Sequence, residues 1–351
     1  MSAFRLGIVG IGDMAGVHAA AAGRLGVDLA VAAGADRARA SALAESTGAA
    51  LYESYDALLA DPAVTGVDLC VPNDLHRRFA ERAFAAGKHV LCEKPIALTL
   101  DDADAMIAGA KAAGVTLMVG HLIRFWPEYA RLREVVRSGE LGRIEWLSLR
   151  RLTGVLSATT GRDGWRASPT RSGGAALDLQ IHDLDFACWL FGSPRTVYAR
   201  GVRSANGTWD HLLTSVAFDG VDAMVEASFL MQSAPFDMAF HLVAERGVVT
   251  YRYSPAAFAL HGLHGEGDQG DSDEPEPSLM LHRAGEESQG LYTPDRDSFE
   301  AAIDAEIGEF VASAGEHRPP TCTGDDARLS LAVSLASRQS CETGQIVRGR
   351  F

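Results

Sequence analysis

The sequence RLGIVGIGDMAGVHAAA, residues 5–21, predicts a strand, a glycine turn and a helix in immediate succession. Arg5–Val9 is a short apolar run typical of a buried strand, and an alanine-rich stretch typical of a helix follows it. Gly10, Gly12 and Ala15 form a G-x-G-x-x-A pattern at the junction. Gly10 allows a tight turn, Gly12 lets a ligand approach the backbone, and Ala15 lets the helix pack close to a sheet.

This turn predicts a dinucleotide phosphate site. The backbone N–H groups of Ile11, Asp13 and Met14 would face the phosphates at the amino end of the helix, where the helix dipole favours negative charge. An ordinary glycine turn is the alternative, because the pattern alone is a weak signal. Its position in a strand–helix–strand unit favours the dinucleotide interpretation.

The acid that binds the ribose of such a cofactor is expected about 20 residues further on. Gly34 occupies the usual place, and Asp36 follows two residues later. Asp36 either reaches the ribose hydroxyls, which favours NAD, or caps the helix that follows it. An inward-turned Arg37 would instead accommodate NADP. The sequence favours NAD and leaves NADP open.

The first 121 residues alternate short apolar runs with helical stretches, which predicts a parallel sheet covered by helices. The expected strands are Arg5–Val9, Val27–Ala33, Val67–Val71, His89–Cys92 and Thr116–Val119. The expected helices lie near residues 13–25, 37–47, 75–86 and 101–113.

After His121 the strands become longer and alternate between apolar and polar residues, which predicts one large, mostly antiparallel sheet. Its expected strands are Ile144–Leu152, Thr196–Arg203, Leu212–Phe218, Ala223–Leu230, Met238–Val243 and Val248–Tyr253. A helix is expected near 127–138, and helices near 174–190, 298–314 and 325–342 are expected to cover this second sheet. We therefore predict an α/β protein with domains at 1–121 and 122–351.

Composition narrows the function classes. The net charge of −14 among 351 residues argues against nucleic-acid binding, which depends on Lys and Arg. No run reaches the roughly 20 apolar residues of a membrane span, and no secretory leader pattern is present. The five cysteines are dispersed, which is typical of a reducing compartment. These features predict a cytoplasmic protein. The acidic, Gly- and Pro-rich segment 262–278 predicts an exposed loop.

A charged tripeptide, Glu93-Lys94-Pro95, ends the apolar strand His89–Cys92. Ligands of open parallel sheets bind beyond the carboxyl ends of the strands, so Lys94 is either a solvated rim residue or a charge directed into a site. A fixed ammonium there could hydrogen-bond a substrate oxygen and stabilise alkoxide character.

The segment SGGAALDLQIHDLDFACWLFG, residues 172–192, predicts a helix. Asp178, His182 and Asp185 share one stripe of it, at positions i, i+4 and i+7. Carboxylates beside an imidazole orient the ring and favour its protonated form, which suits a general acid or base. A metal site is the less favoured alternative, because a catalytic zinc needs three protein ligands and no HExxH or cysteine cluster supports one. A capped surface helix is the second alternative.

Three segments together resemble one family. They are the glycine turn, residues 67–114 with PNDLH and EKP, and residues 164–192 with the helix above. The chain resembles the glucose–fructose oxidoreductase, inositol dehydrogenase and rhizopine-catabolism (Gfo/Idh/MocA) family along nearly its whole length. The resemblance implies a Rossmann domain followed by an α/β domain whose large open sheet builds homodimers or homotetramers.

The resemblance also assigns roles. It makes Lys94 the catalytic lysine, held after a cis Lys94–Pro95 peptide, and brings Glu93 near the cofactor ribose. His182 becomes the general base that Asp178 orients. It places five residues beside the nicotinamide half: Pro72, Asn73, His76, Trp165 and Arg166. The alternative for His76 is a residue at a helix start with no ligand.

The same resemblance brings Asp185 and Arg124 to a polar substrate, although Arg124 could equally form a salt bridge between domains. Gln180 and Leu179 depart from the pattern of many members and weaken an inositol assignment. The sequence therefore predicts an NAD(P)-dependent oxidoreductase of a secondary alcohol or ketone in a sugar, sugar derivative or cyclitol. Alternatives are an NAD-dependent glycosidase that oxidises its substrate transiently and a non-catalytic cofactor-sensing regulator.

Overall fold

The structure, a computed structural model, describes residues 4–154, 165–204, 207–231, 234–254, 278–349 and 351. Two compact units divide the chain, one formed by Met1–Phe125 with Phe299–Arg328, the other by Trp126–Ser298 with Leu329–Phe351. The domain boundary after residue 121 stays a prediction. Residues Phe299–Arg328 belong to the first unit, so one boundary in the sequence cannot separate the two units. The expected acidic loop lies outside the described residues, except for its last residue, Ser278.

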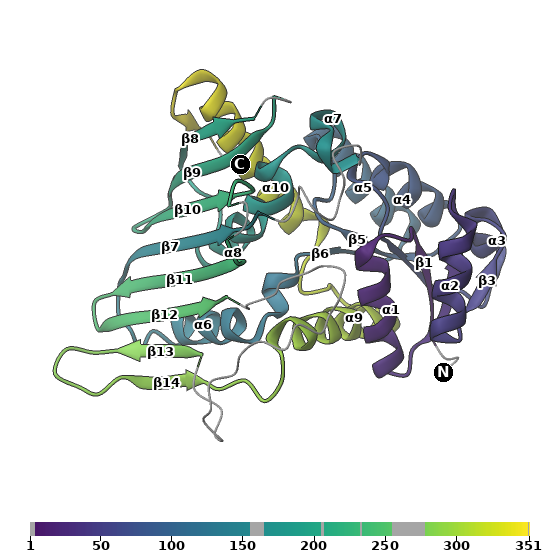
Figure 1. The fold of residues 1–351 in the computed structure, drawn as a ribbon, viewed down its shortest axis with the longest axis horizontal. Helices are drawn as coiled ribbons and strands as arrows, with labels where there is room; N and C mark the ends of the chain where they lie inside the picture. Colours follow the sequence, from purple (N-terminus) through teal and green to yellow (C-terminus); the bar gives the residue numbers. More distant parts are fainter. Residues whose placement is uncertain (1–3, 155–164, 205–206, 232–233, 255–277, 350) are drawn as a thin grey trace. The chain divides into compact units, whose positions relative to one another are not determined.

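The first unit contains a six-stranded parallel sheet in the order β3-β2-β1-β4-β5-β6 (Figure 1). Its strands are β1 Arg5–Val9, β2 Asp28–Ala32, β3 Ala50–Tyr52, β4 Gly66–Leu69, β5 His89–Glu93 and β6 Leu117–Gly120. Its helices are α1 Asp13–Arg24, α2 Arg37–Thr47, α3 Tyr55–Ala60, α4 His76–Ala85 and α5 Leu100–Ala113, with α9 Ser298–Glu316 added from later in the chain. The strand order reverses between β1 and β4, which is where open α/β sheets bind ligands.

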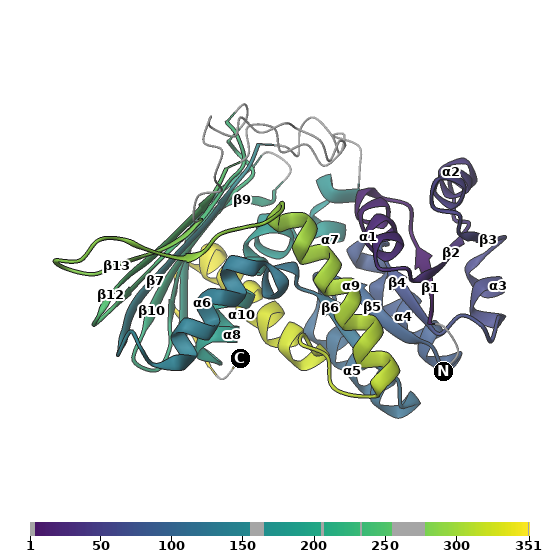
Figure 2. The ribbon, with the colours of Figure 1, turned by 90° about the horizontal axis from the view of Figure 1, so that it is seen from below.

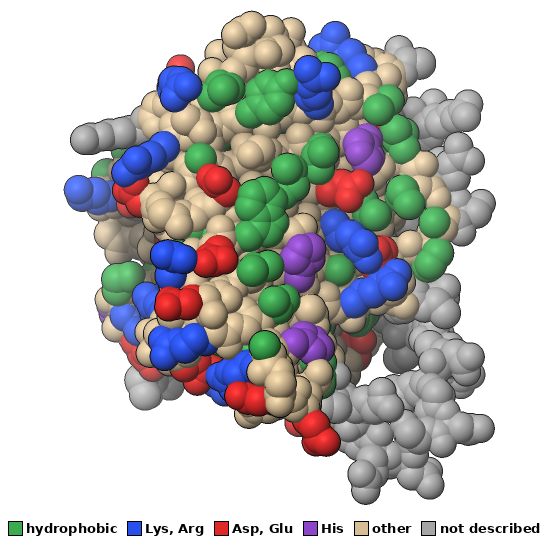
Figure 3. Space-filling view, turned by 90° about the vertical axis from the view of Figure 1, so that its left-hand side faces the viewer, with side chains coloured by type: hydrophobic (Ala, Val, Ile, Leu, Met, Phe, Trp, Pro, Cys, Tyr) green, Lys and Arg blue, Asp and Glu red, His purple; other side chains and the backbone are tan. Residues whose placement is uncertain are grey.

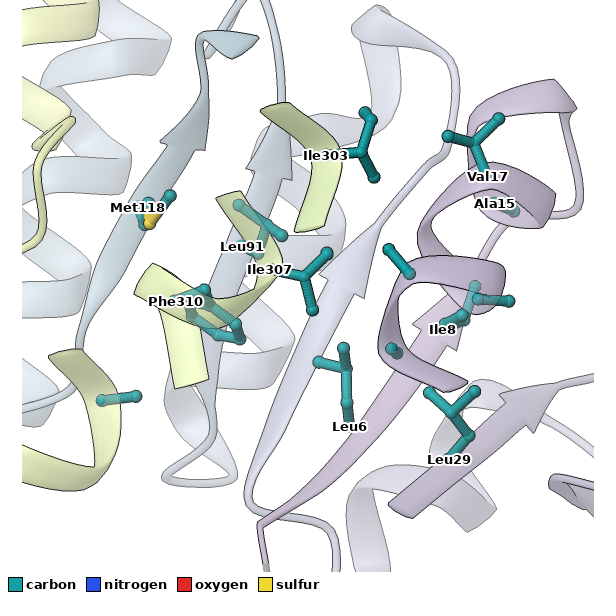
Figure 4. Close-up of a cluster of buried hydrophobic side chains, with 14 residues drawn as sticks. Leu6, Ile8, Ala15, Val17, Leu29, Leu91, Met118, Ile303, Ile307 and Phe310 are labelled. Atoms are coloured by element: carbon teal, nitrogen blue, oxygen red, sulfur yellow. The ribbon is translucent and has the colours of Figure 1, made fainter. Parts of the chain in front are cut away.

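The helix α9 corrects one expectation. It was expected to cover the second sheet, but its apolar residues Ile303, Ile307 and Phe310 are fully buried in the core of the first unit. They pack against the β1, β5 and β6 side chains shown in Figure 4: Leu6, Ile8, Leu91 and Met118. Spacing of i, i+4 and i+7 identifies the buried face of a helix, but it does not identify the sheet that the face meets.

The second unit is built on a nine-stranded sheet in the order β14-β13-β12-β11-β7-β10-β9-β8-β15. The neighbours β7 and β10 are parallel and the other pairs are antiparallel, as the predicted mostly antiparallel sheet requires. The strands are β7 Ile144–Leu152, β8 Thr196–Arg203, β9 Trp209–Ala217, β10 Asp222–Ser228, β11 Asp237–Ala244, β12 Gly247–Tyr253, β13 Leu279–His282, β14 Gln289–Tyr292 and β15 Val347–Arg348.

Helices cover one face of this sheet (Figure 2). They are α6 Pro127–Ser138, α8 Ile181–Phe191 and α10 Gly324–Thr343, whereas the short helix α7 Pro169–Ser172 packs on the 3-10 turn Trp165–Ala167. The side chains of Leu147, Val225 and Phe240 are buried on the covered face, while their neighbours along each strand are more exposed. This alternation is typical of a sheet with one packed face.

The other face of the sheet carries an apolar centre. Figure 3 shows green side chains and histidines gathered there, with Lys, Arg, Asp and Glu around them. Its members include Trp146, Met224, Val243 and Leu213, of which Leu213 is 44% exposed. Contiguous apolar surface of this kind often marks an interaction site. Among the helices that the structure describes, none combines the length and apolarity needed to cross a bilayer.

Candidate functional site

The glycine turn has the geometry that a phosphate site needs. Gly10 has a φ of +98°, and a Cβ there would lie 2.4 Å from the carbonyl oxygen of Cys70. Gly12 is the N-cap of α1, and a Cβ on it would meet none of the described atoms within 4 Å. Ala15 is fully buried against the sheet. The amino end of α1, including Asp13, therefore fits the phosphates of a dinucleotide.

Asp36 and Arg37 both have partners of their own. The carboxylate of Asp36 accepts a hydrogen bond of 3.0 Å from the backbone N–H of Arg39, so it caps α2. The guanidinium of Arg37 donates to Glu53, with 2.8 Å between Nη2 and Oε1. All these side chains are exposed, so the pair is weakly held. The cap uses one carboxylate oxygen of Asp36 and leaves the other for a ligand such as a ribose hydroxyl. The carboxylate of Glu53, by contrast, would repel a 2′-phosphate that approached Arg37.

Lys94 directly follows β5, at the same sheet edge as the glycine turn. The strands β1, β4 and β5 are parallel neighbours, so their carboxyl ends lie side by side. Two strand spacings, about 10 Å, separate the ends of β1 and β5. Lys94 is half-buried, and the Lys94–Pro95 peptide is cis, as the resemblance implies.

His76 lies in the interior. Its Nδ1 atom is 2.8 Å from the carbonyl oxygen of Pro95, and its Nε2 atom is 3.0 Å from that of Val71. Burial lowers the pKa of His76, although both carbonyls oppose that shift. The ring therefore joins the segment after β4 to the segment after Lys94. Asn73 is also buried, in a 3-10 turn that precedes α4. Pro72, at the N-cap of that turn, is half-buried.

The helix that carries Asp178 and His182 is not a regular α-helix. Ala176–Gln180 forms a π-helical turn, and α8 begins only at Ile181. The expectation of a regular α-helix through Asp178 is therefore wrong. Such turns widen a helix and are frequent at functional sites. Asp178 is mostly buried and His182 is half-buried.

Arg166 contacts Asp178, a pair that the sequence did not reveal. The Nε atom of Arg166 is 3.6 Å from Oδ2 of Asp178, and its guanidinium stacks 4.7 Å from the ring centre of Trp165. Both residues lie in the short 3-10 turn Trp165–Ala167. Within the second unit, Arg166 therefore lies beside the carboxylate that is expected to orient His182.

Asp185 and Arg124 are engaged inside the protein. Asp185 is fully buried and accepts a hydrogen bond of 2.6 Å from the hydroxyl of Ser330. Arg124 is 3% exposed, donates to the carbonyl of Thr321 at 3.0 Å and lies 3.5 Å from a carboxylate oxygen of Asp326. That ion pair joins two segments of the first unit. These contacts favour structural roles over direct contact with a substrate.

Gln180 joins four elements of the second unit. Its amide nitrogen donates to the carbonyl of Val225 at 3.1 Å, and its oxygen accepts from the hydroxyls of Thr214 and Ser337 at 3.1 and 2.9 Å. It is fully buried. At Gln180, the departure from the family pattern therefore coincides with a core hydrogen-bond network.

Comparison with known proteins agrees with this geometry. The sequence model described as an oxidoreductase family with an NAD-binding Rossmann fold matches residues 4–121, and that of the matching C-terminal domain covers residues 129–250. The 1,5-anhydro-D-fructose reductase of Ensifer adhaerens is 31% identical over 299 residues, covering 83% of this chain and 82% of the relative. The chain belongs to the Gfo/Idh/MocA oxidoreductase family.

One further relative and one solved structure cover almost the whole chain. Inositol 2-dehydrogenase of Rhizobium meliloti (strain 1021) is 28% identical over 342 residues, 96% of each chain. A structure of levoglucosan dehydrogenase in complex with NADH and levoglucosan superposes with a TM-score of 0.83 at 20% identity, covering 98% of this chain and 99% of the other. At that identity the last comparison supports the fold alone.

Alanine substitutions separate the two glycines of the turn. Gly10→Ala should lower the melting temperature by several degrees, because its Cβ would collide with the Cys70 carbonyl at a positive φ. Gly12→Ala should change stability by less than about 1 kcal/mol, since its Cβ meets no described atom, but it should weaken NADH binding by crowding the phosphates. Thermal unfolding and NADH fluorescence titration measure both effects. Unchanged NADH affinity in Gly12→Ala would contradict the phosphate assignment.

Proposed function

We propose that this protein is an NAD(P)-dependent oxidoreductase that interconverts a secondary alcohol and a ketone in a sugar, sugar derivative or cyclitol. The observation that carries the proposal is Lys94, an ammonium at the same sheet edge as the glycine turn. The names of the reductase and dehydrogenase relatives, which refer to polyhydroxylated compounds, support the substrate class.

Each residue has a chemical task in this proposal. The nicotinamide supplies or accepts the hydride when the cofactor is bound. Lys94 donates a hydrogen bond to the reacting oxygen and stabilises negative charge on it. His182 takes the hydroxyl proton during oxidation and returns it during reduction. Asp178 orients the imidazole, and Arg166, 3.6 Å from Asp178, helps to hold that carboxylate in place.

For the cofactor we propose NAD over NADP. Asp36 keeps a carboxylate oxygen for the ribose hydroxyls while the other caps α2. A 2′-phosphate would require Arg37 to leave Glu53. Use of NADP would therefore show that this exposed ion pair opens on binding.

We also propose that the protein forms a homodimer or homotetramer through the apolar face of its second sheet. The side chains of Trp146, Met224 and Val243 lie there on adjacent strands, and no described helix of the second unit covers them. A two-fold arrangement would bury this face against its copy.

Removing the lysine amine should abolish most catalysis without loss of the cofactor. A panel of sugars and polyols is assayed with NAD and with NADP, by the absorbance of reduced nicotinamide. On any active substrate, Lys94→Ala should lower kcat by about 10²–10³-fold, as is typical for loss of one charge-stabilising donor. Lys111→Ala, an exposed lysine on α5, serves as the control.

Near-normal turnover of Lys94→Ala would remove the lysine from the reaction. Release of the aryl alcohol from aryl glycosides, without net reduction of the cofactor, would favour the glycosidase alternative over the proposed dehydrogenase.

Replacing the proposed base should change the pH profile of alcohol oxidation. In the native protein the rate should rise as His182 loses its proton, because only the neutral ring accepts one. His182→Ala should lose that limb and about 10²–10⁴-fold in rate. His317→Asn, at an exposed position after α9 in the first unit, is the control. A profile identical to the native one would exclude His182 from the proton path.

Charge on the apolar sheet face should reduce the oligomeric state. The double variant Met224→Glu, Val243→Glu should elute as a smaller species in size-exclusion chromatography with light scattering, because burying two carboxylates against a copy is unfavourable. Asp219→Asn, in the exposed turn between β9 and β10, should leave the mass unchanged. A monomeric native protein at micromolar concentration would refute the self-association proposal.

A further inference from the structure

Four titratable side chains meet inside the first unit. His18 of α1 has its Nδ1 atom 2.8 Å from Oδ2 of Asp68 on β4. Its Nε2 atom lies 3.4 Å from Oε1 of Glu93, at the end of β5, and 3.8 Å from Oε1 of Glu306 on α9. His18, Asp68 and Glu306 are at most 1% exposed, and the Glu93 side chain is 12% exposed. We call these four residues the buried acid cluster.

Three carboxylates cannot all be ionised in such a place at neutral pH without a large desolvation cost. Burial works to lower the pKa of His18, but Asp68 prevails and raises it well above its ordinary value. Burial raises the pKa of Glu306 to about 8, against the opposing effect of His18. Within the cluster a protonated Glu306 is therefore favoured beside a protonated His18, and Glu93, whose pKa burial raises, is held toward its ionised form by His18.

Glu93 connects this interior to the edge of the sheet that carries Lys94. Its Oε2 atom accepts a hydrogen bond of 3.1 Å from the backbone N–H of Lys94, while Oε1 faces His18 and Glu306. Gly120 on β6 leaves room for this arrangement, because a Cβ there would lie 3.3 Å from Oε1 of Glu306 and 3.6 Å from Oε1 of Glu93. One carboxylate oxygen is thus tied to the lysine segment and the other to the buried cluster.

We propose that His18 and Glu306 are positioning residues that hold Glu93 ionised and in one orientation, so that cofactor affinity depends on the proton carried by Glu306. This inference rests on the proposed function and on the family resemblance, which brings Glu93 near the cofactor ribose. His18 supplies the opposite charge that keeps Glu93 ionised despite its burial. Glu306, while protonated, completes the cluster without repelling Glu93.

The other groups that face the cluster do not replace these two. Cys70 has its sulfur 3.7 Å from Nδ1 of His18, and burial raises the pKa of its thiol, so it stays neutral. The same holds for Cys92 on β5, whose pKa burial and Glu93 both raise. The charge of Lys94 favours an ionised Glu93 from the solvent side and adds to the effect of His18.

The test is NADH affinity as a function of pH, measured by fluorescence without any substrate. When Glu306 loses its proton, its charge repels Glu93, the only partly exposed member of the cluster. In the native protein the Kd for NADH should rise about threefold to tenfold between about pH 7 and about pH 9.5, as expected for the loss of one hydrogen bond. Glu306→Gln keeps the shape and cannot ionise, so its Kd should change less than about twofold.

A second variant tests the histidine. His18→Asn keeps a donor near the Nδ1 position and loses Nε2 and the positive charge. Glu93 should then hold its proton to a higher pH than in the native protein, because burial raises its pKa and the opposing effect of His18 is lost. NADH should bind about threefold to tenfold more weakly at about pH 7 than to the native protein.

Glu316→Gln is the control for Glu306→Gln. It replaces an exposed acid on the same helix and should show the native pH dependence of NADH binding.

Thermal unfolding shows whether the variants fold. It also tests the raised pKa of Glu306 independently of NADH binding. A carboxyl group whose pKa is raised in the folded protein stabilises it fully below its unfolded pKa and loses that contribution as pH rises to the folded value. The pKa of Glu306 is about 8. The melting temperature of Glu306→Gln minus that of the native protein should therefore increase from about pH 5 to about pH 8 and then stay constant.

Two results would overturn the inference: the same pH dependence of NADH binding in Glu306→Gln and native protein, or a stoichiometric divalent metal in elemental analysis of the purified protein. In the second case the same four side chains would be ligands and not proton carriers. A negative result in the sugar and polyol panel would instead refute the proposed function alone, since NADH binding needs no substrate.

Discussion

The passage of Gly10 beneath the Cys70 carbonyl is the constraint on which the first unit depends. A Cβ at residue 10 would lie 2.4 Å from that oxygen, so only glycine lets the chain leave β1 this close to the segment that leaves β4. At this point the strand order reverses, and α1 begins with its amino end at the sheet edge. The parallel pairing of β1, β4 and β5 then brings Lys94 to the same edge, so the anion site and the ammonium share one geometric cause.

The two units solve the problem of buried charge in different ways. In the second unit Arg151 and Asp183 form a bidentate pair, at 2.9 and 3.0 Å, so two opposite charges satisfy each other in the core. The buried acid cluster has more carboxylates than cations, and protons must make up the difference. In that pair burial raises the pKa of Asp183, and Arg151 opposes the shift. A proton-sharing cluster responds to pH where its members titrate, and Glu93 brings that response to the edge beside Lys94.

The sequence predicted those features that a local pattern of residue types determines. The parallel strands β1, β2, β4, β5 and β6 follow from apolar runs, and Lys94 follows from the end of such a run together with the family resemblance. The three-residue strand β3 carries too short a pattern, and the amphipathic α9 reveals a buried face without its partner sheet. The π-helical turn is not visible from spacing, because spacing arguments assume a regular helix. Long-range polar partners cannot be inferred from local sequence, since those of Gln180 are two hydroxyls and one backbone carbonyl more than 30 residues away.

Two histidines of the first unit, His18 and His76, show that the atoms around a histidine set the direction of its pKa shift. His18 faces carboxylates and is held protonated, whereas His76 faces two backbone carbonyls and burial lowers its pKa. A neutral His76 has one N–H and donates to only one of the carbonyls of Val71 and Pro95 at a time, and it adds no charge behind Lys94. A protonated ring there would repel the ammonium, and the coupling between Lys94 and His76 already acts against protonation of the ring. The lysine segment therefore has the His76 ring on one side and the Glu93 carboxylate, which accepts from the Lys94 backbone N–H, on the other.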